Sequence, residues 1–157
     1  MEAMEEITER LKRILGENLI KVKIPRERRI FISIRKDALR EAVNYLVKVL
    51  DLRHLSTITG VDLGGEISLI YHLTYRGSIV ISITITVSKE NPVAPTITDL
   101  IPGAVLYERE VHDLLGVRFK GHPDLSPLIL PEGWPEDVYP LRKECKLEEL
   151  RELTSKK

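Results

Sequence analysis

Two segments near the start of the chain repeat apolar residues with the period of an amphipathic helix. The first ends at Gly16, a residue suited to the left-handed position that follows a helix, and its apolar stripe consists of Ile7, Leu11, Ile14 and Leu15. The second opens at Asp37, and its stripe consists of Leu39, Val43, Leu46 and Leu50. We expect both helices to bury these stripes and the second to cover a sheet.

Four segments up to residue 88 have the composition and alternation of strands. The first is a short strand around residues 30–34, and the three longer ones cover 54–62, 66–75 and 78–88. Short turns that contain glycine separate the longer strands, which predicts an antiparallel meander. The last strand carries mostly polar residues on one face and only isoleucine on the other, at Ile79, Ile81, Ile83 and Ile85. The helices should pack on this isoleucine face.

A third long helix is expected in the second half of the chain. Pro102 suits its first turn, and the helix should run to about Leu115 and end at Gly116. Its expected core stripe is Ala104, Tyr107, Val111 and Leu114.

Residues 117–145, which we call the C-terminal arm, show neither the strand nor the helix period, and five prolines exclude long regular structure. The arm is nevertheless rich in apolar residues: Leu125, Leu128, Ile129, Leu130, Trp134, Val138, Tyr139 and Leu141. Such a segment is more typical of a surface held mainly by a partner than of a disordered linker. The alternative is a loop that folds back over its own sheet. Residues 146–157 predict a short, marginal helix.

Together these patterns predict an α+β fold: an antiparallel or mixed sheet of about four strands, covered by helices, with a long irregular C-terminal arm. Residues 1–116 would form the α+β domain, and residues 117–157 the docking arm and the short tail helix, as parts of one structural domain. A chain of 157 residues is long enough to bury a core without disulfides or metal.

Charge and composition exclude several classes of function. The 24 Lys and Arg residues balance 24 Asp and Glu residues, so neither nucleic acid nor an anionic membrane surface is an expected partner. The single cysteine, Cys145, cannot form an intrachain disulfide, and an iron–sulfur cluster normally takes four thiolates. We expect a cytoplasmic protein, because no apolar run approaches a membrane span and residues 1–10 lack a secretion signal. The absence of Gln, with abundant Glu, Lys, Arg and Ile, is typical of a thermophile protein.

The densest group of reactive side chains lies in residues 107–113. Helical spacing places Glu108 beside His112 and Arg109 beside Asp113. One interpretation is a small hydrolase or isomerase in which His112 is a general base oriented by Glu108 or Asp113. The other is a set of surface or interface ion pairs beside the apolar stripe, which is the more common role of a charged helix face. No nucleophile-elbow motif accompanies these residues.

Metal and nucleotide sites lack their usual sequence signals. The residues from which a metal site might be drawn have no paired spacing: His112, His122, Asp113 and Asp124. Residues 121–124 fit a turn, in which Pro123 restricts the backbone and Asp124 accepts from neighbouring amides. Residues 60–65 have the wrong spacing for a dinucleotide fingerprint and predict a hairpin turn. We therefore expect neither a metal nor a nucleotide on this chain.

The same region resembles the signature of a known family, the 30 kDa subunit of respiratory complex I. The order and spacing agree with the family pattern E-R-E-x-x-D-x-x-G-x-x-F-x-G-H-P-D-L followed by P-L-R-K. The residues that match it are Glu108, Arg109, Glu110, Asp113, Gly116, Phe119, Gly121, His122, Pro123, Asp124, Leu125, Pro140, Leu141, Arg142 and Lys143. The resemblance extends more weakly over residues 30–145.

This resemblance implies an α+β domain whose C-terminal arm embraces the large catalytic subunit of a membrane-associated oxidoreductase complex. Family members bind no cofactor themselves. The NiFe site or quinone site belongs to the large subunit, and neighbouring subunits hold iron–sulfur clusters. The motif residues, together with Trp134, would hold the turn geometry and the partner interface.

Two departures from the family pattern bear on the type of complex. Ser126 and Pro127 stand where many relatives have an Arg pair, and Val105 or Leu106 stands where a Trp is common. The lost arginines favour a hydrogenase-type or related ion-pumping complex over a quinone-reducing one. We expect a non-catalytic peripheral subunit, on the cytoplasmic face of the membrane, of a complex that couples electron transfer to ion translocation. The alternatives are the enzyme centred on His112 and an adaptor without redox context.

Overall fold

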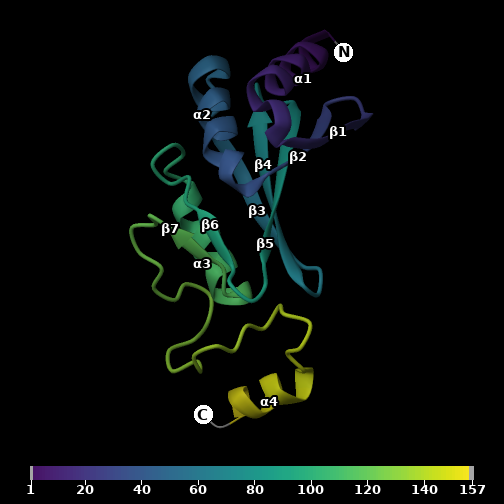
Figure 1. The fold of residues 1–157 in the computed structure, drawn as a ribbon. Helices are drawn as coiled ribbons and strands as arrows, with labels where there is room; N and C mark the ends of the chain where they lie inside the picture. The colour runs from purple at the N-terminus through teal and green to yellow at the C-terminus, as the bar shows by residue number, and fades with distance from the viewer. Residues whose placement is uncertain (1, 156–157) are drawn as a thin grey trace.

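The computed structural model describes residues 2–155, and this part of the chain forms four α-helices and seven strands (Figure 1). The helices are α1 (Glu2–Leu15), α2 (Leu39–Leu50), α3 (Ala104–Leu115) and α4 (Leu147–Ser155). The strands are β1 (Leu19–Arg26), β2 (Arg29–Ile34), β3 (His54–Asp62), β4 (Glu66–Tyr75), β5 (Ile79–Ser88), β6 (Val93–Pro95) and β7 (Arg118–Lys120). In addition, 3-10 turns follow α1 at Gly16–Asn18 and precede α2 at Lys36–Ala38.

The first five strands form one mixed sheet in the order β1-β2-β5-β4-β3. Neighbouring strands are antiparallel except β2 and β5, which run parallel because α2 and the β3–β4 hairpin lie between them in the chain. The predicted meander is confirmed for β3, β4 and β5, and their ends match the expected ones within one residue. The α+β class is therefore confirmed, with one strand more in the main sheet than expected.

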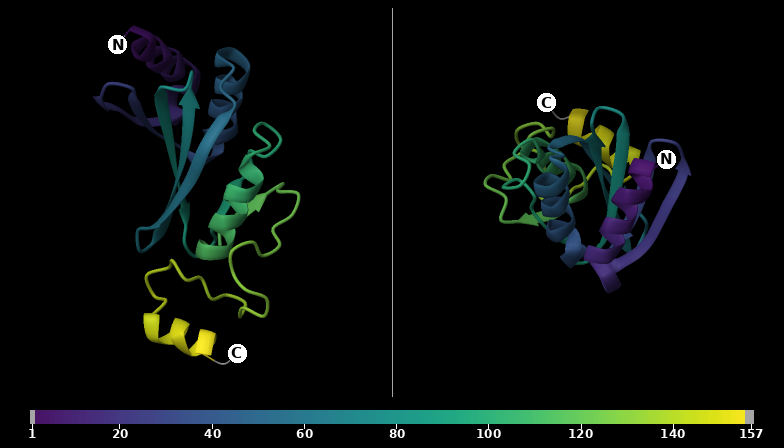
Figure 2. Two further views of the ribbon diagram at one scale, coloured as in Figure 1. Left: turned by 180° about the vertical axis from the view of Figure 1, so that it is seen from behind. Right: turned by 90° about the horizontal axis from the view of Figure 1, so that it is seen from above.

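The isoleucine face of β5 forms the centre of the core, as predicted. Strand register places the following buried side chains on the same face: Ile30, Ile32, Leu69, Tyr71, Leu73, Ile81 and Ile83. Both N-terminal helices pack their apolar stripes onto it, contributing Leu11 and Leu15 from α1 and Leu39 and Leu46 from α2. In Figure 2 these two helices lie side by side over the sheet at one end of the molecule, and α4 lies at the other end.

Helix α3 covers the same face and approaches β3 at Gly60. A Cβ atom at Gly60 would overlap the side chain of Leu115, so the close approach requires glycine in the middle of this strand. The buried residues of α3 are Ala104, Glu108, Val111, Asp113 and Leu115. Of the predicted stripe, Ala104 and Val111 are buried, Tyr107 is partly buried and packs against the core, and Leu114 is only partly buried. A carboxylate, Glu108, takes a core position because polar groups inside the fold bind it.

Three strands are absent from the sequence prediction. β1 escapes it because an edge strand buries little, and Ile20 and Ile24 stay exposed on it. β6 and β7 have three residues each and pair in parallel as a small second sheet. β7 extends regular structure to Lys120, beyond the expected domain end at residue 116. Residues 121–146 contain neither helix nor strand.

We predict that Ile83→Ala lowers the free energy of unfolding by roughly 2 to 5 kcal/mol, because it removes buried methyl groups and leaves a cavity. Thr86→Ala is the matched control, since Thr86 lies on the opposite face of β5 and is exposed. Denaturant titration of both variants measures the difference. A loss below about 0.5 kcal/mol for Ile83→Ala would contradict the assignment of the core face.

Candidate partner interface at α3 and the C-terminal arm

Glu108 lies on the buried face of α3 and is inaccessible to solvent. Its carboxylate accepts hydrogen bonds from the hydroxyl of Thr96 and from the amide of Ile97, which lies 2.8 Å away. It therefore joins α3 to the segment that follows β6. The predicted pairing of Glu108 with His112 is wrong, and a residue this deeply buried does not itself contact a partner.

The burial of Glu108 changes its acidity. Burial raises the pKa of Glu108 to about 7, although the hydrogen bonds from Thr96 and Ile97 favour the charged form. The folded protein therefore holds this proton more tightly than the unfolded chain, in which a glutamate titrates at about pH 4.3. The stability that this carboxyl contributes is fully present below about pH 4.3 and is lost as the pH rises through about 7.

Asp113 holds the C-terminal arm against α3. One of its carboxylate oxygens accepts hydrogen bonds from three successive amides, those of Leu128, Ile129 and Leu130, at 2.7, 2.7 and 3.2 Å. Outside helices and strands these amides need another partner, and a buried carboxylate supplies one. Asp113 binds the arm in this way instead of pairing with Arg109, so that predicted ion pair is also wrong.

Arg109 binds the arm a few residues earlier. Its Nε donates to the carbonyl of Ser126 at 3.0 Å, and its Nη2 donates to the Ser126 hydroxyl and to the carbonyl of Pro127. Asp124 in turn accepts from the amide and the hydroxyl of Ser126. Ser126 and Pro127, the two departures from the family pattern, are thus hydrogen-bonded to Arg109 of α3.

Residues 121–124 form the predicted turn. The amide of His122 donates to the carbonyl of Phe119, and Gly121 has a φ of +91°. His122 Nε2 lies 3.1 Å from the carbonyl of Val105, and His122 Nδ1 accepts from the amide of Asp124. Since a carbonyl only accepts, Nε2 carries the proton, and both ring nitrogens are bound within the chain.

The sequence Leu141-Arg142 caps the C-terminal end of α3. The amide of Leu141 donates to the carbonyl of Leu114, and Arg142 Nε donates to the carbonyl of Leu115 at 2.8 Å. The last carbonyls of a helix have no partner within the helix, and its dipole favours a cation at this end. These two motif residues therefore make contacts within the chain.

Tyr139 packs over the same helix end. A Cβ atom at Gly116 would lie 2.5 to 2.8 Å from three atoms of the Tyr139 ring, and Gly116 has a φ of +74°. The guanidinium carbon of Arg142 lies 4.4 Å from the centre of this ring. Both the backbone conformation and the ring require glycine at position 116.

Asp62, at the end of β3, fixes the last part of the arm. Its carboxylate accepts from the amide of Lys143 at 2.9 Å, from Lys89 Nζ at 2.6 Å and from the amide of Gly64 at 2.8 Å. Burial alone raises the pKa of Asp62, but these hydrogen bonds outweigh it and hold the pKa well below its usual range. Sequence reasoning missed this residue, because Asp-Leu-Gly-Gly indicates only a hairpin turn.

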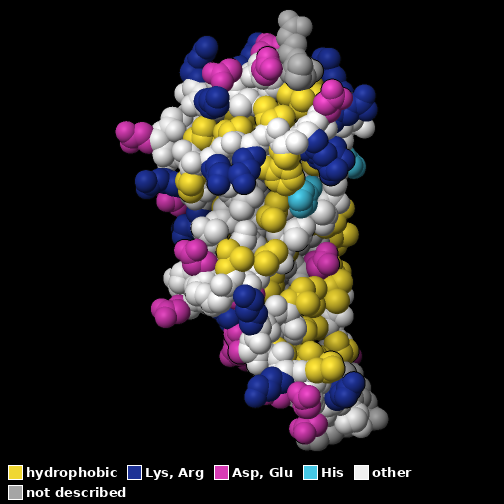
Figure 3. Space-filling model, turned by 90° about the vertical axis from the view of Figure 1, so that its right-hand side faces the viewer, with side chains coloured by type: hydrophobic (Ala, Val, Ile, Leu, Met, Phe, Trp, Pro, Cys, Tyr) yellow, Lys and Arg dark blue, Asp and Glu magenta, His cyan; other side chains and the backbone are white. Residues whose placement is uncertain are grey.

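The expectation that a partner is the main support of the arm stays a prediction, but the chain itself also holds the arm. Asp113, Arg109, Tyr139 with Arg142, and Asp62 attach it to its own domain, as the alternative of a folded-back loop predicted. The outward side of the arm and of α4 still exposes apolar residues: Leu128, Ile129, Leu141 and Leu147, at 38%, 53%, 56% and 58%. Figure 3 shows hydrophobic side chains in a band that runs down one face toward the end with α4.

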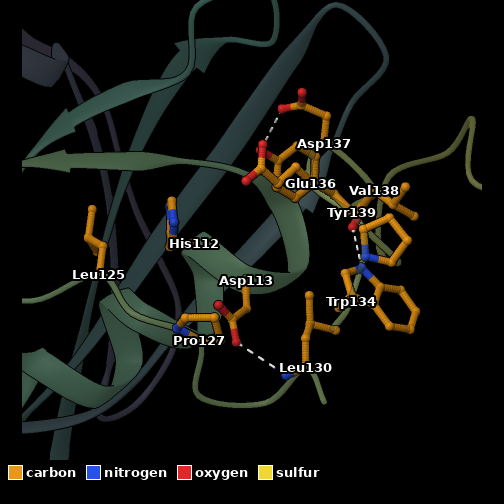
Figure 4. Close-up of a pocket in the computed structure, with 11 residues that line it drawn as sticks. His112, Asp113, Leu125, Pro127, Leu130, Trp134, Glu136, Asp137, Val138 and Tyr139 are labelled. Carbon is orange, nitrogen blue, oxygen red and sulfur yellow. Dashed lines mark hydrogen bonds between the residues drawn. The ribbon is translucent and has the colours of Figure 1, made fainter. Parts of the chain in front are cut away.

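A pocket of about 300 Å³ lies between α3 and the arm (Figure 4). Trp134 Nε1 donates to the carbonyl of Val138 at 2.8 Å, which fixes the indole ring in its wall. His112 Nδ1 lies 2.9 Å from the carbonyl of Val117 and donates to it, because a carbonyl only accepts. The remaining lining residues are Asp113, Leu125, Pro127, Leu130, Pro135, Glu136, Asp137 and Tyr139.

This geometry does not assemble the acid–base pair of the enzyme hypothesis. His112 bonds the carbonyl of Val117, while Glu108 and Asp113 bind backbone amides of other segments. Within residues 2–155, no group of three or more His, Cys, Asp or Glu side chains is placed to hold a metal ion.

Comparison with protein families identifies the fold. The family described as "Respiratory-chain NADH dehydrogenase, 30 Kd subunit" matches residues 32–151. The chain belongs to this family. The resemblance carried by the motif residues of α3 and the arm is thereby confirmed.

The relatives are named as subunits of different complexes. Membrane-bound hydrogenase subunit beta of Pyrococcus furiosus is 32% identical, over 75% of this chain and 70% of the relative. A subunit of the NADH-quinone oxidoreductase of Roseiflexus castenholzii is 35% identical, over 74% of this chain and 69% of the relative. A longer NADH-quinone oxidoreductase subunit from Phocaeicola vulgatus is 39% identical over 72% of this chain, and the match spans only 22% of that protein.

A solved structure agrees with the whole fold. A chain of the membrane-bound sulfane sulfur reductase, an archaeal respiratory membrane complex, superposes with a TM-score of 0.84 at 26% identity. The match covers 99% of this chain and 92% of the other. This protein therefore has the same fold as a subunit of a respiratory membrane complex.

We predict that Glu108→Gln removes one pH-dependent contribution to the stability of the protein. Gln keeps both hydrogen bonds, because its oxygen accepts from Ile97 and its amide donates to Thr96. The difference in free energy of unfolding between the variant and the natural chain should grow in favour of the variant as the pH rises. From about pH 4.5 to pH 8 this growth should amount to on the order of 3 kcal/mol. Denaturant titrations across this range measure the gain, and Glu110→Gln on the same helix is the control. Parallel pH profiles for all three proteins would contradict the assignment.

We predict that Arg142→Ala lowers the free energy of unfolding of the free chain by about 1 to 3 kcal/mol, because Leu115 loses a charged donor and Tyr139 its stacked cation. Arg53→Ala is the control, since Arg53 is paired only at the surface, with its side chain 75% exposed. Thermal or denaturant unfolding distinguishes the two. Equal free energies of unfolding for the Arg142→Ala and Arg53→Ala variants would favour a partner as the main support of the arm.

Proposed function

We propose that this chain is a non-catalytic, peripheral subunit of a membrane-associated, multi-subunit oxidoreductase that couples electron transfer to ion translocation. Its role is to brace the large catalytic subunit, the one with a NiFe or quinone site, on the cytoplasmic face of the membrane. Family membership supports this assignment, as do the relatives that are named as subunits of a hydrogenase and of a quinone oxidoreductase.

The main support for the proposal is that the arm is hydrogen-bonded to its own domain and still exposes apolar side chains to solvent. Leu128, Ile129 and Leu141 are between 38% and 56% exposed, and they belong to a backbone fixed by Asp113 and Arg142. A preordered surface loses less conformational entropy on docking than a flexible one. The arm therefore suits permanent attachment to a large, rigid partner.

The chemistry of the complex is assigned to its other subunits, which would carry the iron–sulfur clusters and, in a hydrogenase-type complex, the NiFe site. His112 bonds the carbonyl of Val117, and Asp113 binds the amide of Leu128 in the arm, which supports a structural role for these side chains. In the described part of the chain, no helix has the length and apolar character needed to cross a membrane.

The proposal predicts that the tagged full chain purifies from membranes with subunits that contain iron–sulfur clusters. Ile129→Asp should release these subunits, because it places a charge in an apolar interface. Val49→Asp is the matched control, since Val49 on α2 is 51% exposed against 53% for Ile129. Affinity purification with metal analysis of the bound subunits provides the measurement. Stable partners without metal centres, or equal retention by both variants, would contradict the proposal.

A further inference from the structure

The pocket between α3 and the arm has walls that suit a flat, cationic side chain. Trp134, Pro127 and Pro135 supply apolar surface, and the indole ring is held by its hydrogen bond to Val138. A volume of about 300 Å³ is at the lower end for ligand pockets, so it suits one large side chain better than a dinucleotide. The pocket belongs to the same arm that carries the exposed Ile129.

The charged residues that line this pocket are carboxylates, while Arg142 and Arg109 stand behind its walls, bound to Tyr139 and Pro127. Its lining contains the carboxylates of Asp113, Glu136 and Asp137 but neither Lys nor Arg. The carboxylate of Asp113 already accepts three amide hydrogens, whereas Glu136 and Asp137 stand exposed at the rim, where one oxygen of Asp137 lies 3.4 Å from the hydroxyl of Tyr139. An incoming group with several N–H donors and a positive charge is complementary to this arrangement.

We infer that the pocket binds an arginine side chain of the large catalytic subunit. This inference rests on the proposed function and names the anchor of that interface. Arginine suits these walls better than lysine, because a planar guanidinium can stack on the indole of Trp134 and offers several N–H donors to the carboxylates of Glu136 and Asp137. Such an arginine at the centre of an interface, seated between aromatic and carboxylate groups, is a typical hot spot.

The single tryptophan of the chain makes the pocket directly observable, since Trp134 lines it. Titration of the purified full chain with N-acetyl-arginine amide should change the tryptophan fluorescence, whereas N-acetyl-leucine amide should not. The double variant Glu136→Gln, Asp137→Asn should weaken this response by about 10-fold or more. Asn is well tolerated at the φ of +61° that Asp137 adopts, so the backbone is preserved. The double variant Glu17→Gln, Glu41→Gln removes two carboxylates elsewhere and should leave the response unchanged.

The same variants test the pocket in the assembled complex. The Glu136/Asp137 variant should lose the large subunit at a lower salt concentration than the natural chain, and the Glu17/Glu41 variant should not.

An equal response to the arginine and leucine probes would overturn the inference. So would concentration-dependent dimers that shield Trp134, because the occupant would then be a second copy of the chain. If the Glu136/Asp137 variant stays bound while Ile129→Asp is released, the pocket inference fails and the proposed function stands. If neither is released, both fail.

Discussion

An irregular segment can be rigid only if its backbone polar groups find partners, and in this protein the charged side chains of α3 and β3 supply them. Asp113 accepts the amides of three successive residues, and Asp62 accepts the amide of Lys143. Arg109 donates to the carbonyls of Ser126 and Pro127. Without these bonds, residues 121–146 would carry unsatisfied groups into a half-buried position, at a cost of about 1 to 3 kcal/mol each. The shape of the arm follows from this requirement.

Helix α3 meets the requirement by presenting different chemistry on each side. Glu108 points into the core and fixes the segment after β6, while Arg109 and Asp113 point to the arm, and the C-terminal carbonyls receive Arg142. Each of these charged groups bonds a backbone group in or beside the fold, which is worth more than an exposed pair with its neighbour one turn away. Tyr139 completes the arrangement, because it fills the space left by the missing side chain of Gly116.

This arrangement gives the family motif an internal role. Several of its residues order the arm, and much of the surface that they order lies outside the motif: Leu128, Ile129, Trp134 and the rim carboxylates Glu136 and Asp137. A scaffold subunit benefits from that division, because the partner meets a preformed surface.

The sequence by itself determined the elements in which one face is buried. Periodicity located α1, α2 and the strands β3 to β5, and the isoleucine face of β5 identified the core, because burial on one side leaves a regular pattern. The order of motif residues indicated the family. Periodicity could not show β1, whose edge position buries little, or the true inward face of α3, where Glu108 occupies a core site. It also could not show that Asp113 and Asp62 bind the arm, because the arm amides that they accept lie 15 to 81 residues away along the chain. Backbone amides are the same at every position of a chain, so only the tertiary structure decided which of them these carboxylates hold.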